Sequence, residues 1–148
     1  YGRFYSEIKL NSEKEWKSSE FANISRMQNN LENKFIQNAA PVLICDTNSF
    51  ATELWHERYM GKMSKYLRTI SESMLTPDLY ILTGDEIPFV QDGTRDGEHI
   101  RHTMHLRFLE ELQSRGYNYL LVTGSKEERL SLAISAIDKV IKSKSVIV

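Results

Sequence analysis

In Val42-Leu43-Ile44-Cys45-Asp46-Thr47-Asn48, four apolar residues lead into an acidic one and then a polar pair. A continuous apolar run of this length is typical of a strand buried on both faces of a parallel sheet. Ligands of such sheets bind at the carboxyl ends of the strands. Asp46 is therefore a candidate for holding Mg²⁺ or for taking a proton from a hydroxyl, and alternatively for capping the helix that follows.

Two more apolar runs end in the same way. Residues 79–82 lead into Thr83-Gly84-Asp85, and residues 119–122 lead into Thr123-Gly124-Ser125. Because the carboxyl ends of parallel strands share one edge of a sheet, we expect the three polar groups along that edge. Residues 145–148 are a candidate for a last short strand or for a frayed tail.

Helical patterns lie between and after these runs. The first begins near residue 11 behind a Ser12 and Glu15 capping box, or later at Ser18 or Ser19, and stops at Ala39-Ala40-Pro41. Later helices are expected from Asn48 or Ser49 to Gly61, in part of 62–77, from about Glu98 to Gly116, and behind a capping box of Ser125 and Glu128. Apolar residues at helical spacing, the candidate core, are Ile24, Met27, Leu31, Phe35, Ile100, Met104, Phe108, Leu112, Leu130, Ala133 or Ile134, Ile137 and Ile141.

Strands that alternate with helices predict an α/β fold, a three-layer parallel sheet flanked by helices with right-handed crossovers. The 148 residues are enough for a single domain, 1–148, with a sizeable core. The formal net charge of −1 gives no bulk attraction to nucleic acid or to an anionic membrane. The single cysteine excludes an internal disulfide, and no apolar run approaches the ~20 residues of a membrane span. These features fit a cytoplasmic protein.

The loop over residues 84–97 is rich in charge, Gly and Pro. Its segment Asp92-Gly93-Thr94-Arg95-Asp96-Gly97 places an arginine between glycines, and arginine suits bidentate recognition of phosphate. A closing lid that excludes water is one interpretation, and a solvated surface loop is the other. Thr123-Gly124-Ser125 has two readings as well, because its amides at a helix N-terminus can meet an anion or a nucleobase edge, or can form a plain turn. The sequence contains neither a Gly-x-x-x-x-Gly-Lys-Ser/Thr loop nor a Gly-x-Gly-x-x-Gly loop.

Several short segments follow one another in a distinctive order. They are Tyr1-Gly2-Arg3-Phe4-Tyr5, Ile24-Ser25-Arg26-Met27-Gln28, Asp46-Thr47-Asn48, Glu57-Arg58-Tyr59-Met60-Gly61 and Phe89-Val90-Gln91-Asp92-Gly93-Thr94-Arg95. In this order they resemble the motifs of the ribosylnicotinamide kinase domain of NadR-type proteins, a P-loop family related in fold to thymidylate kinases. The chain departs from the family pattern at Phe4, where the family has Glu, and at Asn48, where it has Asp.

The resemblance implies ATP-dependent phosphorylation of nicotinamide riboside to nicotinamide mononucleotide, a step of NAD biosynthesis, with ATP and Mg²⁺ as cofactors. It implies that the first strand, the P-loop and its helix, about 30 residues, precede Tyr1, so that the chain as printed is a partial domain and inactive alone. It assigns catalysis to Asp46, which can also hold Mg²⁺ through water, and to Arg95. The substrate residues it implies are Arg3, Gln28, Thr47, Asn48, Tyr59, Phe89 and Asp92, and the nucleotide residues are Arg95, Ser125 and Arg129.

Two other functions remain open at this stage. One is a P-loop kinase for a different nucleoside, and the other is a pyridine-nucleotide-sensing domain of a NadR-like transcriptional regulator. The resemblance also allows a fused DNA-binding or adenylyltransferase domain upstream, and an oligomer. For this domain itself, the expected partner is nicotinamide riboside or a related small molecule, with no nucleic acid and no membrane.

Overall fold

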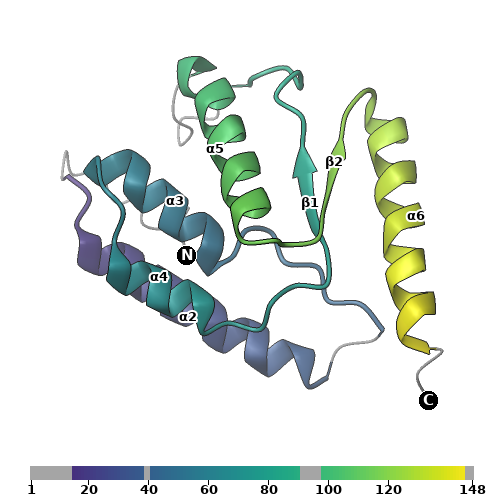
Figure 1. The fold of residues 1–148 in the computed structure, drawn as a ribbon, viewed down its shortest axis with the longest axis horizontal. Coiled ribbons are helices and arrows are strands. Elements are labelled where there is room, and N and C mark those ends of the chain that lie inside the picture. The colour runs from purple at the N-terminus through teal and green to yellow at the C-terminus, as the bar shows by residue number, and fades with distance from the viewer. Residues whose placement is uncertain (1–14, 39–40, 91–97, 146–148) are drawn as a thin grey trace. The chain divides into compact units, whose positions relative to one another are not determined.

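The computed structural model describes residues 15–38, 41–90 and 98–145. The chain divides into two compact units, Tyr1–Thr76 and Pro77–Val148, and each is described here by itself (Figure 1). The helices and strands follow in chain order as α2 (Ser18–Ile36), α3 (Ser49–Met60), α4 (Lys65–Glu72), β1 (Tyr80–Thr83), the short 3₁₀ helix η1 (Glu98–Ile100), α5 (Arg101–Ser114), β2 (Tyr119–Val122) and α6 (Lys126–Ser145).

The first unit is built from α2, α3 and α4, which pack on one another. Its core contains Phe21, Ala22, Leu67 and Ile70, and Trp16, Trp55 and Met60 pack against that cluster. Burial of these large side chains is the main stabilising term, since each fully buried one contributes about 1.5–3 kcal/mol.

The helix ends of this unit follow the local signals in the sequence. The Asn48 side chain accepts a hydrogen bond from the Ala51 amide at 3.1 Å and so caps α3. Gly61 ends the same helix with a φ of 69°, a left-handed conformation that glycine adopts without steric cost. For α2 the later of the two predicted starts is confirmed, because the helix begins at Ser18. The earlier capping box involves Ser12, which lies outside the described residues.

A buried glutamate ties α3 to α4. Glu53 is fully buried, and its carboxylate accepts hydrogen bonds from Arg68 Nε at 3.0 Å and from Ser71 Oγ at 2.6 Å. A buried carboxylate without such partners would be strongly destabilising, so these two donors help α3 and α4 to pack together.

Two predictions for this unit are wrong. Residues 42–45 are extended but form no strand, and Ile44 is 78% exposed, because no partner strand lies beside them in the described part of the chain. On α2 the inward face is formed by Phe21, Ala22, Ile24, Ser25 and Asn29, whereas Met27, Leu31 and Phe35 are exposed. The helix presents the first set to α3 and α4, which leaves Leu31 and Phe35 on a different face.

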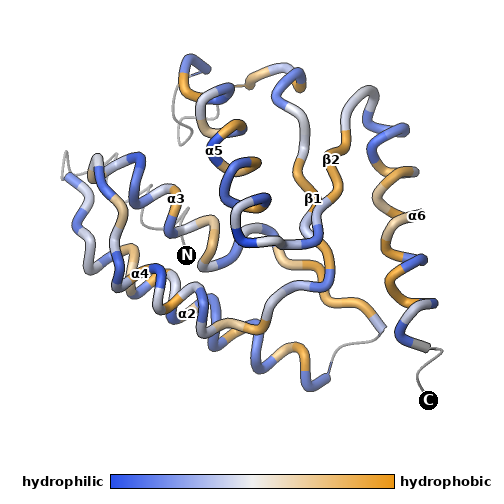
Figure 2. The backbone as a smooth tube through the Cα atoms, viewed as in Figure 1, coloured by the Kyte–Doolittle hydropathy of each residue, from blue (hydrophilic) through white to orange (hydrophobic). Residues whose placement is uncertain are grey.

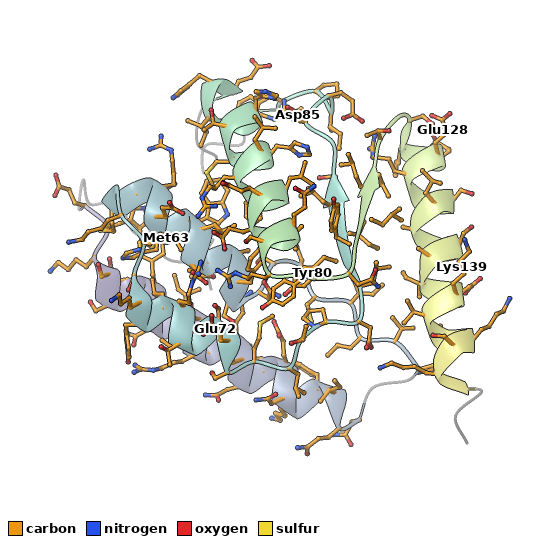
Figure 3. The ribbon with its side chains drawn as sticks, in the orientation of Figure 1. Met63, Glu72, Tyr80, Asp85, Glu128 and Lys139 are labelled. Atoms are coloured by element: carbon orange, nitrogen blue, oxygen red, sulfur yellow. The ribbon has the colours of Figure 1, made fainter. Side chains whose placement is uncertain are left out.

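The second unit contains a parallel pair of strands. Tyr80 pairs with Tyr119 at one end and Thr83 with Val122 at the other, and α6 runs along β2 (Figure 1). Both strands are coloured as hydrophobic along much of their length in Figure 2. The Tyr80 ring, labelled at the start of β1 in Figure 3, stacks on Tyr117 with centroids 5.3 Å apart. This pair of strands is the part of the predicted parallel sheet that the described residues form.

Helices α5 and α6 follow their predicted ranges closely, but their faces follow them only in part. Met104 and Leu112 of α5 are buried as expected. On α6, Leu130 and Ile134 were expected inside but are 57% and 50% exposed. Ala133, the alternative to Ile134, is half-buried instead, because the face that α6 turns to β2 is rotated from the one that the spacing favoured.

Candidate functional site

A cavity of about 170 Å³ lies in the first unit, between α2 and the extended segment that precedes α3. It is lined by Gln28, Leu31, Glu32, Phe35, Leu43, Ile44, Cys45, Asp46 and Thr47. Leu31 and Phe35, which were expected in the core but are exposed, form part of its wall. A wall that mixes apolar side chains with a few convergent polar ones is typical of small-molecule sites.

Asp46 sits at the end of the apolar segment, as its sequence position suggested. Its carboxylate has no hydrogen-bond or ion-pair partner among the residues that the structure describes. The next residue, Thr47, has a φ of 61°, which is a rare left-handed conformation for a β-branched residue. Such backbone strain costs about 1–3 kcal/mol and is often found at functional sites.

Hydrogen bonds from the Thr47 side chain hold this turn in place. Thr47 Oγ1 donates to the Asp46 backbone carbonyl at 2.6 Å and accepts from Gln28 Nε2 at 3.3 Å. Thr52 Oγ1, on α3, donates to Gln28 Oε1 at 3.3 Å. The side chain of Gln28 thus bridges α2, the Asp46–Thr47 turn and α3, so three residues predicted for the substrate site, with Asn48 as the helix cap, do come together.

Two side chains of the cavity have raised pKa values. Burial raises the pKa of the Glu32 carboxyl, and one of its oxygens, Oε1, is buried without a hydrogen-bond partner among the described residues. The pKa of the Cys45 thiol is also raised, by burial and then by the negative charge of Glu32. Glu32 and Cys45 therefore interact electrostatically within the same cavity, which Asp46 also lines.

This arrangement can position and deprotonate a hydroxyl. The Asp46 carboxylate, which no described residue engages, can accept a proton, and the adjoining Gln28 amide can orient a polar substrate. Together with the Thr47 hydroxyl, the Asp46 carboxylate also offers oxygen donors that suit a hydrated Mg²⁺. In the described residues no three His, Cys, Asp or Glu side chains gather to hold a metal by themselves.

Other predicted site residues lie apart from this cavity or outside the description. The Tyr59 ring packs in an aromatic cluster with Trp16 at 5.6 Å and Phe21 at 6.0 Å, and it does not line the cavity. Arg3, Asp92 and Arg95 lie outside the described residues.

In the second unit, the segment after β1 is held by α5. Arg101 donates to the Asp85 backbone carbonyl at 2.9 Å and to that of Ile87, and its guanidinium lies 5.8 Å from the centroid of the Phe89 ring. The Asp85 carboxylate, labelled in Figure 3, contacts His102 Nδ1 at 2.6 Å, and this hydrogen bond lowers the pKa of Asp85. Phe89, predicted to stack on a nicotinamide ring, thus has one face near a cation.

The turn between β2 and α6 carries the residues predicted to bind the nucleotide. Ser125 and Glu128 form the expected capping box, with 2.7 Å from the Ser125 amide to Glu128 Oε2. The Gly124 amide donates to Glu86 Oε1 at 2.9 Å, and Arg129 donates to the Gly124 carbonyl. The two amides that were expected to be free for an anion are therefore taken by carboxylates.

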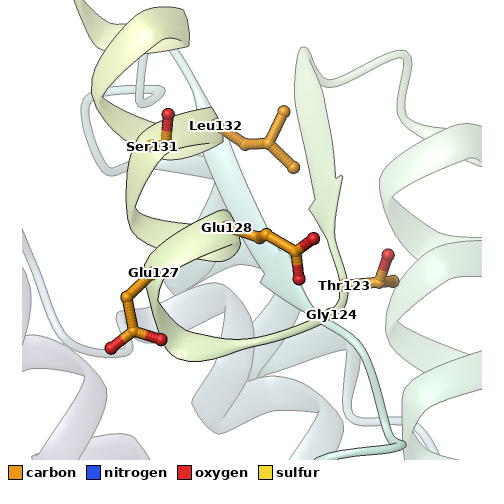
Figure 4. Close-up of a pocket in the computed structure, with 6 residues that line it drawn as sticks. All are labelled: Thr123, Gly124, Glu127, Glu128, Ser131 and Leu132. Carbon is orange, nitrogen blue, oxygen red and sulfur yellow. The ribbon is translucent and has the colours of Figure 1, made fainter.

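A cavity of about 660 Å³ adjoins this turn (Figure 4). Thr123, Gly124, Glu127, Glu128, Ser131 and Leu132 line it, and Glu128 points back toward the turn. Two carboxylates in its wall disfavour phosphate by like-charge repulsion, whereas the amino edge of a nucleobase meets them well. Of the two predicted ligands for this turn, the anion and the nucleobase edge, the surroundings favour the second.

Sequence reasoning missed Glu32, Cys45 and Thr52 as residues of the first site. A signal for Glu32 was present, because Gln28, Leu31, Glu32 and Phe35 follow the i, i+3, i+4, i+7 spacing of one helix face. That face joins polar and apolar side chains and is not a core stripe. No comparable signal marks Thr52, whose contact with Gln28 spans 24 residues of sequence.

Comparison with known proteins identifies the family. The sequence model of the AAA domain family matches residues 1–129, so the chain belongs to that family. It therefore carries a P-loop NTPase-like AAA domain, with which its α/β architecture agrees. Searches of curated proteins and of solved structures gave no match. None of the described helices is both long and apolar enough to cross a membrane.

Proposed function

We propose that this domain transfers the γ-phosphoryl group of ATP to the ribose hydroxyl of nicotinamide riboside and so forms nicotinamide mononucleotide. Membership of the AAA domain family supports the use of a nucleotide. The observation that carries the proposal is the Asp46 carboxylate, which lines a cavity and has no partner in the described residues. A carboxylate that serves only to cap a helix would be bonded to backbone amides, and at α3 Asn48 makes that contact instead.

The reaction assigns a definite task to four side chains of the cavity. The ribose hydroxyl donates its proton to the Asp46 carboxylate, and its oxygen forms a bond to the γ-phosphorus while the bond to the β-phosphate oxygen breaks, which releases ADP. Gln28 and Thr47 hold the turn that presents Asp46, and the apolar wall at Phe35 receives the base. The strained φ of Thr47 keeps the Asp46 backbone in one conformation before substrate arrives.

Mg²⁺ fits this site through Asp46, whose carboxylate and neighbouring hydroxyl are the oxygen donors that the ion prefers. When bound, it would supply positive charge to the phosphate oxygens of the nucleotide. Arg95, Ser125 and Arg129 are the residues that we assign to the nucleotide.

The first experiment replaces Asp46 by asparagine in the full-length protein. The amide keeps the shape of the side chain but cannot take the proton, so we expect kcat for nicotinamide mononucleotide formation to fall by ~10² or more. The matched control is Asp138→Asn, because Asp138 is exposed on α6 and lines neither cavity.

Two results would contradict the proposal in different ways. If Asp46→Asn melts like the wild type and retains activity within a few-fold, Asp46 is not the catalytic group. If the wild-type protein binds nicotinamide riboside but yields no product with ATP and Mg²⁺, the domain is a sensor of pyridine nucleosides and not a kinase.

A further inference from the structure

Glu32 is the one carboxylate of the first cavity that the proposed chemistry does not use. Its Oε1 atom is buried and has no hydrogen-bond partner within the described ranges. Leaving a buried polar atom unpaired costs about 1–3 kcal/mol, and more for a charged group. Native proteins rarely keep such an atom without a reason, and an absent ligand is one of the usual reasons.

The surroundings of Glu32 show what kind of ligand would meet it. Leu31, Phe35 and Leu43 line the same cavity, so the buried oxygen of the carboxylate has apolar neighbours. Lys34, two residues along α2, is exposed and forms no ion pair with it. Asp46 lines the same cavity and adds a second carboxylate to it. The cavity therefore combines apolar side chains with two carboxylates.

We propose that Glu32 is a specificity-determining residue that selects a positively charged aromatic base, placed between its carboxylate and the apolar wall formed by Leu31 and Phe35. The inference rests on the proposed function, and it deepens that function by naming the charge of the accepted base. The pyridinium ring of nicotinamide riboside is flat, apolar at its faces and carries a unit positive charge. It supplies the countercharge that Glu32 lacks, and it also fills the apolar part of the cavity.

Discrimination then follows from electrostatics at short range. A neutral ring of the same shape buries the same apolar surface but leaves Glu32 uncompensated. A pyridinium base that carries its own carboxylate, as in nicotinic acid riboside, has no net charge and brings a negative group toward Glu32. The cavity should therefore bind the cationic riboside more tightly than either the neutral or the zwitterionic one.

Cys45 makes this ranking measurable without turnover. It is the only cysteine of the chain and lines the cavity, so its alkylation by N-ethylmaleimide reports occupancy at that place. The probes are nicotinamide riboside, its reduced dihydro form, in which the ring nitrogen is neutral, and nicotinic acid riboside. Each Kd is obtained from the ligand concentration that halves the alkylation rate relative to the same protein without ligand, which removes any change in intrinsic thiol reactivity.

The variants are Glu32→Gln, Glu32→Asp and, as a matched control, Glu72→Gln. Glu72 lies exposed at the end of α4, labelled in Figure 3, and does not line the cavity. In the wild type we expect nicotinamide riboside to bind at least about tenfold more tightly than its reduced form, the factor given by 1.4 kcal/mol. Glu32→Gln should bring that ratio close to one, whereas Glu32→Asp and Glu72→Gln should preserve the preference.

The outcomes distinguish failure of the Glu32 proposal from failure of the proposed kinase function. If the wild type protects Cys45 equally with the cationic and the reduced riboside, or if Glu32→Gln leaves the preference unchanged, the role of Glu32 is overturned while the kinase proposal stands. If none of the three ribosides protects Cys45 in the wild type, the cavity is not the riboside site, and both proposals fail.

Discussion

Glu111 on α5 is a buried glutamate and Glu32 on α2 a half-buried one, and they lie in two different units of the chain. The Glu111 carboxylate accepts from Arg107 Nη2 at 2.7 Å and from Arg115 Nε at 2.8 Å, so each oxygen has a cationic partner. One oxygen of Glu32 is buried with no partner in the described part of the chain. Burial alone would raise the pKa of both groups, but the two arginines hold the pKa of Glu111 below its usual range while that of Glu32 stays raised.

The difference distinguishes buried carboxylates that stabilise the fold from those that are available to bind a ligand. A buried carboxylate with two charge-assisted hydrogen bonds is part of the structure, and Glu53 in the first unit belongs to the same class. A buried carboxylate without them reduces the stability of the folded state, so its presence indicates a use other than stability. Glu32 lines the cavity that also holds Asp46 and the strained Thr47.

The largest stability effect is expected from Glu111→Ala. Removing the carboxylate takes away the buried partner that Arg107 and Arg115 share, and breaking a buried pair in this way costs about 3 kcal/mol. Hydrogen exchange followed by mass spectrometry should show faster exchange across α5 and β2, with nicotinamide riboside protection of Cys45 unchanged.

The control for that experiment is Glu110→Ala on the same helix. Glu110 also pairs with Arg107, at 2.9 Å, but its side chain is 70% exposed, so its loss should cost well under about 1 kcal/mol. Equal effects of the two substitutions would show that the arginine pairs of Glu111 do not stabilise the second unit.

An intermediate effect is expected from acid on the first unit. His56, the only histidine among residues 1–76, is buried, contacts Ser18 Oγ at 2.9 Å, and burial lowers its pKa below the ordinary 6.5. As the pH falls below 6.5, the unfolded chain takes up a proton that the folded chain refuses. The free energy of unfolding should then decrease, by at most ~1.4 kcal/mol per pH unit, until the pH reaches the folded pKa.

His56→Gln tests the assignment, because glutamine can still meet Ser18 but does not titrate. Hydrogen exchange of α2 and α3 should depend on pH between 6.5 and 5 in the wild type and much less in the variant. The contribution of Glu111 in the second unit is also lost as the pH falls, but in a lower pH range. Its pKa is lowered, so that contribution is present above pH 4.5 and is lost only as the pH falls further. A slope between pH 6.5 and 5 that persists in His56→Gln would rule His56 out as its source.

Local signals in the sequence predicted the elements that local interactions decide. The caps at Asn48 and Gly61 and the capping box of Ser125 and Glu128 each depend on neighbours within a few residues, and all are confirmed. Residues 42–45 have the composition of a buried strand, but a strand exists only where a second strand supplies its hydrogen bonds. The sequence of residues 42–45 alone does not show whether such a neighbouring strand is present.

The same distinction applies to the candidate site. Gln28, Thr47 and Asn48 were predicted from their resemblance to family motifs, and the structure brings them together around Asp46. Glu32 escaped prediction because an acidic residue on a helix is usually solvated. Only the burial of its oxygen atom, which depends on how α2 lies against residues 43–47, distinguishes it from the exposed Glu72.

The smallest effect concerns Glu32 itself, and its sign is the informative part. The pKa of Glu32 is raised, so its charged form is disfavoured in the folded state, and its contribution to stability is largest below pH 4.5 and declines as the pH rises through the folded pKa. At pH 7 the Glu32→Gln protein should therefore melt above the wild type, by about 2 °C for a chain of this length. At pH 4 the gain in melting temperature should vanish, and Glu72→Gln should show no gain at either pH.

A saturating concentration of nicotinamide riboside should reverse the order of the two melting temperatures at pH 7, because the ligand stabilises the wild type more than the variant that binds it weakly. A Glu32→Gln protein that melts below the wild type in the absence of ligand would mean that the carboxylate supports the fold, and the contrast with Glu111 would be lost.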